Sequence, residues 1–109
     1  MHDSVLERRY EMHLIRKANP QEGSYTSYLF TEGMDKILKK VGEECAEVII
    51  AAKNGGGEAL VAECADLVYH LEVMLAEAGI PISALLAELE ERAKKTGNLK
   101  VMKTTDKNT

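Results

Sequence analysis

Four acidic residues in the middle of the chain have a spacing that could build a metal site. Glu44 and Glu47 are three residues apart, and so are Glu63 and Asp66. In an α-helix, residues with this spacing lie about one turn apart on the same face, so each pair can direct its carboxylates the same way. If two helices bring the pairs together, their oxygens suit a hard divalent cation, most naturally Mg²⁺.

The alternative is an ordinary charged helix surface, because Glu is a good helix former and often pairs with a Lys four residues away. Lys39 has this spacing from Glu43. Lys40 has the same spacing from Glu44. On a helical wheel, however, Glu44 lies at the edge of an apolar stripe, and carboxylates crowded beside a core are costly to keep for packing alone. Spacing and wheel position leave both interpretations open.

The two acidic pairs fall in two predicted helices that a glycine run separates. The first helix is predicted from Thr31 or Gly33 to Lys53, and the second from Glu58 to Ala78. The apolar stripe of the first is Met34, Ile37, Leu38, Val41, Cys45, Val48, Ile49 and Ala52. The residues between the helices, Asn54-Gly55-Gly56-Gly57, favour a chain reversal because glycine readily adopts positive φ. We therefore predict a helical hairpin with acidic residues on both arms.

The second arm is apolar around most of its circumference. Its main polar gap holds Glu63, Asp66, His70 and Glu77. A helix of this kind is usually central in its bundle, so we predict that the gap faces an internal slot. A chain of 109 residues can bury only a modest core by itself. We therefore expect a second copy to cover part of this arm, giving a homodimer or a larger homo-oligomer.

Other helices are predicted on either side of the hairpin. One runs from about Ser4 to Arg16 and ends before Asn19-Pro20, and a loop then leads to a short helix near Tyr28 to Thr31. The last helix opens at Pro81 or Ser83 and continues through Arg92. The residues after it turn polar.

These patterns predict an all-α fold, a helical bundle built around the central hairpin and completed by oligomerisation. No run of alternating apolar and polar residues predicts a strand. Residues 1–93 are assigned to one all-α domain, and we expect residues 94–109 to form a polar, mobile tail.

Charge and hydropathy exclude several classes of protein. The net charge is −4 and the Lys and Arg residues are scattered, so nucleic acid is not an expected partner. The longest strongly apolar stretch, Val48 to Ala52, is far too short to span a membrane, and the N-terminus lacks the pattern of a signal peptide. We expect a cytoplasmic protein. Cys45 and Cys64 are predicted to be small buried residues, because neither has a metal-ligand or redox spacing.

Two segments resemble a known family. The first is Ser24-Tyr25-Thr26-x-x-Leu29-Phe30-x-x-Gly33-x-Asp35-Lys36-Ile37-Leu38-Lys39-Lys40-Val41-Gly42-Glu43-Glu44 and its continuation to Lys53. The second is Ala65-Asp66-Leu67-x-Tyr69-His70. Together they resemble the phosphoribosyl-ATP pyrophosphatases, which belong to the all-α nucleotide pyrophosphohydrolases, and the resemblance covers most of residues 5 to 92. The superfamily is marked by Glu-x-x-Glu, a variable spacer and Glu-x-x-Asp, and these match Glu44, Glu47, Glu63 and Asp66.

The resemblance implies Mg²⁺-dependent hydrolysis of phosphoribosyl-ATP to phosphoribosyl-AMP and pyrophosphate, in histidine biosynthesis, by an obligate oligomer. It implies that the four matching carboxylates hold the metal. Some relatives are fused to the cyclohydrolase that acts next, and at 109 residues this chain is expected to perform the pyrophosphatase step alone.

Such a reaction needs positive charge on the phosphate oxygens and an oriented water. Glu44 is predicted to act in catalysis as a metal ligand. Glu43, also a predicted catalytic residue, could hold a second ion, orient water or pair with Lys39. Lys36 and Lys40 share one side of the wheel with Glu43, so we predict that they bind the phosphate chain, with ordinary salt bridges as an equally good explanation.

Three further polar residues are predicted near this site. Tyr25 and Thr26 are assigned to ribose or phosphate contacts, although hydroxyls in a turn are also routine capping groups. His70 lies four residues after Asp66, and we interpret it as a hydrogen-bonded structural histidine rather than as a base.

Two other functions stay open. One is a related pyrophosphohydrolase that removes ordinary or damaged nucleoside triphosphates from the nucleotide pool. The other is a helical oligomerisation module without enzyme activity, whose acidic slot would be only a polar seam. A di-iron carboxylate bundle is disfavoured, because it would require two Glu-x-x-His pairs.

Overall fold

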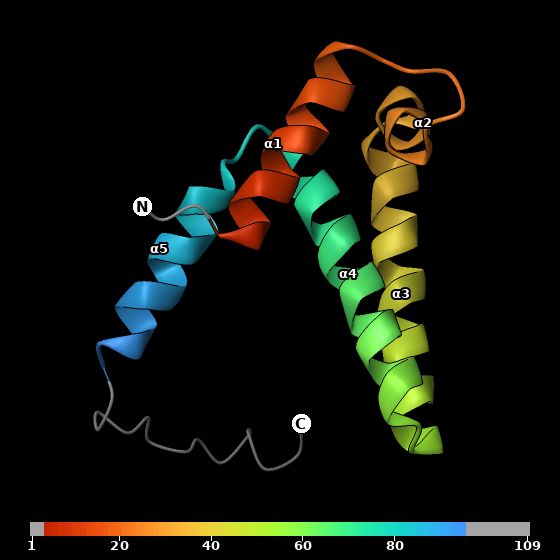
Figure 1. Ribbon diagram of the computed structural model, residues 1–109, viewed down its shortest axis with the longest axis vertical. Helices are drawn as coiled ribbons and strands as arrows, with labels where there is room; N and C mark the ends of the chain where they lie inside the picture. Colours follow the sequence, from red (N-terminus) through yellow and green to blue (C-terminus); the bar gives the residue numbers. More distant parts are fainter. Residues whose placement is uncertain (1–3, 96–109) are drawn as a thin grey trace.

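The computed structural model describes residues 4–95, which form five helices and no strand (Figure 1). The helices are α1 (Val5–Ala18), α2 (Tyr25–Glu32), α3 (Met34–Asn54), α4 (Gly57–Ala78) and α5 (Ile82–Ala93). The predicted all-α class is confirmed. The predicted mobile tail lies outside the described residues from position 96 onward.

The predicted hairpin is formed by α3 and α4, which run antiparallel side by side (Figure 1). Gly55 ends α3 in the left-handed conformation, with φ of 78°, and its N–H donates to the carbonyl of Ala52. This is the role in which glycine is favoured after a helix. Within the described part of the chain, α4 is the helix that contacts all four others, as its apolar circumference predicted.

The core consists of two small clusters, both formed by the C-terminal half of α4 with its neighbours. In the first, Ala76 packs with Tyr10 of α1 and Ile82 of α5. In the second, Val73 packs with Leu29 of α2 and Ile37 of α3. Among residues 4–95, no other helix lies beside the half of the hairpin nearest its turn (Figure 1). The described residues therefore leave that half exposed on the sides that do not face the opposite arm.

The two cysteines correct a prediction. Cys45 and Cys64 are both exposed, whereas we predicted small buried residues. Leu38 and Ile49, which belong to the same predicted stripe, are also exposed. The periodicity identified the apolar side of the helix correctly, but no helix among residues 4–95 covers that side.

The helix α2 begins earlier than predicted, at Tyr25, where we expected a loop. Ser24 starts it, because the Ser24 side chain accepts a hydrogen bond from the N–H of Ser27 at 3.1 Å. Gly33, with φ of 94°, both ends α2 and precedes the first residue of α3. Only glycine adopts such a conformation without strain, so a single residue sets the angle between the two helices.

The outer helices match the predicted positions closely. α1 begins with a reciprocal cap between Ser4 and Glu7 and extends two residues beyond its predicted end at Arg16. Within residues 4–95 no single helix is long and apolar enough to cross a bilayer; α4 and α5 meet that criterion only as a pair bent by 117°.

Candidate functional site

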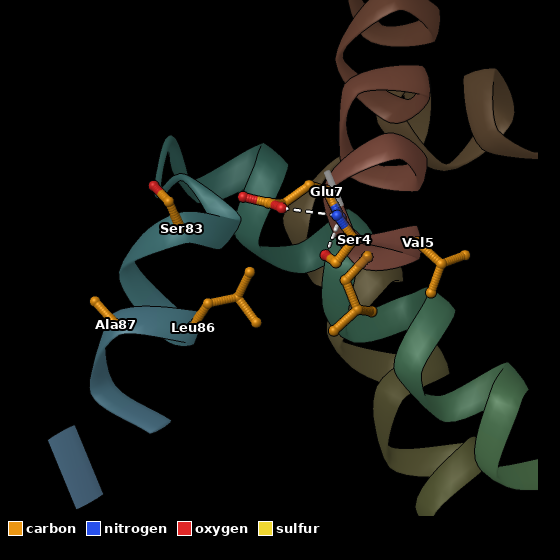
Figure 2. Close-up of a pocket in the computed structure, with 7 residues that line it drawn as sticks. Ser4, Val5, Glu7, Ser83, Leu86 and Ala87 are labelled. Carbon is orange, nitrogen blue, oxygen red and sulfur yellow. Dashed lines mark hydrogen bonds between the residues drawn. The ribbon is translucent and has the colours of Figure 1, made fainter. Parts of the chain in front are cut away.

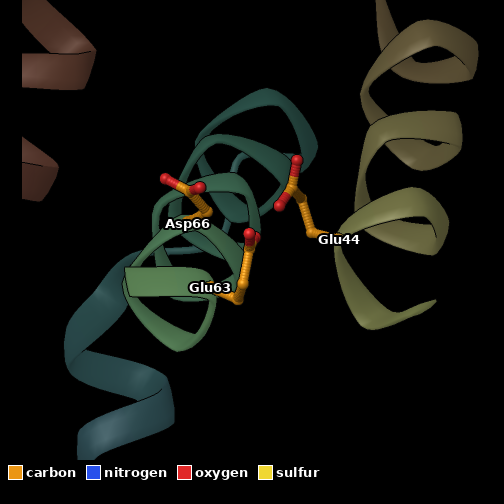
Figure 3. Close-up of side chains that lie close together, drawn as sticks. All are labelled: Glu44, Glu63 and Asp66. Atoms are coloured by element: carbon orange, nitrogen blue, oxygen red, sulfur yellow. The ribbon is translucent and has the colours of Figure 1, made fainter. Parts of the chain in front are cut away.

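Three carboxylates from the two arms of the hairpin converge. Glu44 of α3 points towards α4, where Glu63 and Asp66 point into the same space (Figure 3). Each offers one oxygen, and the three oxygens lie within 4.8 Å of one another. Glu44 is only 7% exposed, Glu63 is half-buried and Asp66 is exposed. We call these three residues the carboxylate cluster.

Two oxygens of the carboxylate cluster are buried without a hydrogen-bond partner in the described structure. They are Oε1 of Glu44 and Oε1 of Glu63. A buried carboxylate oxygen without a donor carries a desolvation cost that a cation would remove. Converging carboxylate oxygens are also the ligands that Mg²⁺ prefers. The cluster therefore fits a divalent cation better than it fits a packing role.

The electrostatics of Glu63 agree with this interpretation. Removal from water, hydrogen bonding with the Glu47 carboxyl and the negative charges nearby raise the pKa of Glu63. Glu47 therefore lies next to Glu63, but it is exposed and outside the set of three mutually close residues. The structure brings together three of the four predicted ligands and leaves Glu47 at their edge.

A cavity of about 320 Å³ opens between α2 and α3. Its lining residues are Tyr25, Tyr28, Lys36, Lys39, Lys40 and Glu43. We call it the lysine cavity. Three ammonium groups face one carboxylate there, so positive charge predominates, as binding of a phosphate requires. Neither Lys39 nor Tyr28 was predicted to belong to the site. Tyr28 follows Tyr25 by three residues, a helical spacing that could have indicated a shared face.

Within the lysine cavity, Lys40 pairs with Glu43. Lys40 Nζ lies 3.1 Å from Glu43 Oε1, and this hydrogen bond lowers the pKa of Glu43 and raises the pKa of Lys40. The pairs that an ordinary charged surface would form at a spacing of four, Lys39 with Glu43 and Lys40 with Glu44, are not the ones formed here. Glu43 and Glu44 are consecutive, yet one lines the lysine cavity and the other joins the carboxylate cluster.

The predicted ribose or phosphate contacts, Tyr25 and Thr26, separate in the structure. Tyr25 lines the lysine cavity and stacks on Tyr28, with ring centroids 6.2 Å apart. Burial raises the pKa of the Tyr25 hydroxyl, and the positive charge of Lys40 partly offsets this rise. Thr26 instead exchanges a hydrogen bond with the hydroxyl of Tyr69. Thr26 is therefore better placed to hold α2 on α4 than to contact a ligand in this cavity.

His70 is buried and hydrogen-bonded through both ring nitrogens, in agreement with the predicted structural role. Its Nδ1 lies 2.8 Å from the backbone oxygen of Asp66, and its Nε2 lies 2.9 Å from the Tyr25 hydroxyl. Both nitrogens already have partners, so the geometry gives no support to a role as a base.

A second hollow lies far from these residues along the chain. It is an open groove of about 710 Å³ between the start of α1 and α5 (Figure 2). Most of its lining is apolar, as at Val5 and Leu86, and its one carboxylate, Glu7, accepts a hydrogen bond from the N–H of Ser4. Its chemistry does not suit a phosphate or a metal ion.

Comparisons with known proteins agree with the family resemblance found in the sequence. The family model described as phosphoribosyl-ATP pyrophosphohydrolase matches residues 8–93. A protein of Pelotomaculum thermopropionicum named phosphoribosyl-ATP pyrophosphatase is 58% identical over 84% of this chain and 93% of its own length. A protein of the same name from Listeria monocytogenes is 59% identical over 81% of this chain and 84% of its own length. A histidine biosynthesis bifunctional protein from Caldanaerobacter subterraneus is 54% identical over 84% of this chain, but only 44% of that protein is matched.

Proposed function

The chain belongs to the phosphoribosyl-ATP pyrophosphohydrolase family, and from this premise we propose that it hydrolyses phosphoribosyl-ATP to phosphoribosyl-AMP and pyrophosphate in a Mg²⁺-dependent step of histidine biosynthesis. Membership makes the chain a hydrolase rather than a helical module without activity. The observation that carries the proposal is the convergence of Glu44, Glu63 and Asp66, two of whose oxygens are buried without partners.

In this proposal Glu44, Glu63 and Asp66 hold Mg²⁺, and Glu47 joins them from the edge of the cluster. A bound Mg²⁺ supplies positive charge for the phosphate oxygens and lowers the pKa of a bound water. The protein contributes carboxylates already held close together, so little ordering remains to be done when the ion binds.

The lysine cavity takes the phosphate chain beside the metal. Lys36 and Lys40, together with Lys39, present ammonium groups that can neutralise phosphate oxygens as charge develops on them. Glu43 is retained as a catalytic group. Its carboxylate holds Lys40 in place and can orient a water or a second ion at the boundary with the cluster.

We also assign a homodimer to this chain, because the hairpin has an uncovered apolar side. Ile37, Glu44 and Ala51 are buried and face α4; the residues one position later include the exposed Leu38 and Cys45. The same pattern is found on α4. Leu60 and Leu67 are half-buried, and the residue directly after each of them, Val61 or Val68, is exposed. In an antiparallel pair, these two exposed stripes lie on the same side.

We call these stripes the apolar hairpin face. It comprises Leu38, Cys45, Ile49, Val61, Cys64 and Val68, which are all exposed. Its two most exposed large side chains are Ile49, at 63%, and Val61, at 70%. A second copy of the chain would remove this surface from water, and such a gain is the usual driving force for association.

The experiment that tests the function compares phosphoribosyl-ATP with a panel of ordinary and oxidised nucleoside triphosphates, with Mg²⁺ and with EDTA. The proposal expects preferred, Mg²⁺-dependent release of pyrophosphate from phosphoribosyl-ATP. Preference for ordinary or damaged triphosphates would instead indicate a nucleotide pool-cleaning enzyme.

Two variants test the site in the same assay. Glu44→Gln and Asp66→Asn keep the side-chain shape while removing anionic ligands, and each should lower kcat/KM by at least about 100-fold, equivalent to about 2.7 kcal/mol of transition-state stabilisation. Glu11→Gln, an exposed position on α1, is the matched control for the charge change. Unchanged Mg²⁺-dependent turnover in both site variants would reject the proposed site.

A further inference from the structure

Two hydrogen bonds between side chains join the start of α2 to the middle of α4. The Tyr25 hydroxyl oxygen lies 2.9 Å from His70 Nε2, and Thr26 Oγ1 lies 2.5 Å from the Tyr69 hydroxyl oxygen. The bonded residues are consecutive in both helices. The two bonds therefore act together, and we call them the α2–α4 clasp.

The direction of the first bond follows from the surroundings of His70. Its Nδ1 lies 2.8 Å from the backbone oxygen of Asp66. A carbonyl oxygen can only accept, so Nδ1 carries the hydrogen. In the neutral imidazole Nε2 is then the acceptor, and the Tyr25 hydroxyl donates to it. The Tyr25 oxygen retains only lone pairs for a ligand, so it suits a ligand hydroxyl or an ammonium group better than a phosphate oxygen.

His70 thereby touches both parts of the candidate site. Asp66 belongs to the carboxylate cluster, and Tyr25 lines the lysine cavity. His70 is only 4% exposed, and its ring lies edge-on to two aromatic rings, with centroids 5.8 Å from Tyr25 and 4.9 Å from Tyr69. It has little room to rotate, so both bonds are held at once.

We propose that His70 is a positioning residue that fixes the distance between the carboxylate cluster and the lysine cavity, so that one triphosphate occupies both. The inference rests on the proposed function. Its physical reason is that the single residue Gly33 connects the C-terminal end of α2 to α3, while the clasp ties the opposite, N-terminal end of α2 to the turn of α4 that follows Asp66. If α2 could move relative to α4, binding of the triphosphate would have to fix their positions at a cost in entropy. A fixed separation between the two parts of the site avoids that cost.

Three variants separate the two bonds of His70. Tyr25→Phe removes the hydroxyl donor and keeps the ring. His70→Asn keeps a donor near the Nδ1 position for the Asp66 carbonyl but loses the acceptor. His70→Gln keeps an acceptor near the Nε2 position but loses that donor. Tyr10→Phe is the matched control. Tyr10 belongs to the other core cluster, and the change removes another tyrosine hydroxyl bond, 2.6 Å long, to the backbone oxygen of Ile80.

The measurement is the coupling between a metal ion and a triphosphate that cannot be hydrolysed. Binding of adenosine 5′-(α,β-methylene)triphosphate is titrated calorimetrically with and without Mn²⁺, and Mn²⁺ binding alone is followed by electron paramagnetic resonance. Tyr25→Phe and His70→Asn should reduce the Mn²⁺-induced gain in analogue affinity by about fivefold or more, while Mn²⁺ affinity alone changes by less than about twofold. His70→Gln should lie between them and the wild type.

A purely structural role predicts a different result. Tyr25→Phe would then lower the melting temperature as Tyr10→Phe does, and both would keep the full gain in analogue affinity. That result, in a wild-type protein that hydrolyses phosphoribosyl-ATP with Mg²⁺, would overturn the inference alone. A wild type without Mg²⁺-dependent hydrolysis would overturn the proposed function and the inference together.

Discussion

His13 and Glu72 form a buried pair that fastens α1 to α4, with His13 Nε2 2.7 Å from Glu72 Oε1. Glu72 is 1% exposed, and its Oε1 also accepts a longer hydrogen bond, of 3.3 Å, from Arg9 Nε. The other oxygen, Oε2, is buried without a partner in the described structure. α1 is therefore attached to α4 through a buried carboxylate, and hydrogen bonds to only one of its two oxygens offset the cost of removing it from water.

Removal of one member of this pair should destabilise the protein more than removal of both. His13→Leu leaves the Glu72 carboxylate in the core with Arg9 as its remaining partner and should lower the free energy of unfolding by about 3–5 kcal/mol, measured by urea denaturation. The double variant His13→Leu with Glu72→Met should recover much of that loss, because an apolar pair needs no compensation.

The control for this prediction is the exposed pair of Arg92 and Glu88, whose atoms lie 2.9 Å apart on α5. Glu88→Gln should change the free energy of unfolding by less than about 1 kcal/mol. A double variant at His13 and Glu72 that is less stable than His13→Leu would show that the charged pair itself stabilises the fold.

Metal binding should distinguish the inner ligands from the residue at their edge. Glu44→Gln should weaken Mg²⁺ binding by at least about 100-fold, and Glu47→Gln by about tenfold or less, because only Glu44 belongs to the set of three close carboxylates. The rise in melting temperature on adding Mg²⁺ to the metal-free protein measures both. Equal losses in the two variants would place Glu47 among the inner ligands.

The apolar hairpin face should determine the oligomeric state. Ile49→Lys and Val61→Lys each place a charge in the surface that a second copy would cover, so both should shift the protein from a dimer to the 12.0 kDa chain in light scattering. Met12→Lys, at an exposed apolar position on α1, should leave the dimer intact. A wild-type protein with the mass of one chain would contradict the assignment.

Alkaline pH should destabilise the protein through tyrosines whose pKa is raised by removal from water. Burial raises the pKa of Tyr10 above its ordinary value of 10.0, so the hydroxyl ionises less readily in the folded protein than in the unfolded chain. The unfolded state then loses protons first, and the free energy of unfolding falls as the pH rises above about 10.

Tyr10→Phe isolates this effect. It should lower stability near pH 7 by about 1 kcal/mol, because the hydrogen bond to Ile80 is lost, and should make the alkaline fall shallower. The fall should persist in part, since burial also raises the pKa of Tyr25 and Tyr69. Urea denaturation at several pH values between about 8 and about 11 measures both changes, and an unaltered alkaline slope would contradict the assignment to Tyr10.

Local patterns in the sequence were sufficient for the five helices, apart from the start of α2, and for the position of Glu44 beside the core. Helical periodicity relates residues within one element, so it correctly placed Glu44 at the edge of the core and identified the turn at Gly55. It also predicted that the second arm would be central. These features depend on neighbours in the chain.

Other features depend on contacts that periodicity does not contain. The bond between Tyr25 and His70 joins residues 45 positions apart, on helices whose relative placement is set by packing. The exposure of Cys45 and Cys64 has a related origin, because periodicity identifies an apolar side but not what covers it. The sequence offered Lys40 two acidic partners, Glu43 at a spacing of three and Glu44 at a spacing of four, and in the structure it pairs with Glu43.

The one-residue connection at Gly33 makes the shape of the lysine cavity dependent on a position that does not line it. One wall of the cavity ends at this glycine and the other begins directly after it. With φ of 94°, any other residue type would be strained there, even though the space around it is open. Variation at this corner would therefore reshape the phosphate pocket while every lysine and carboxylate remained in the sequence, so an intact set of functional residues does not by itself guarantee a working pocket.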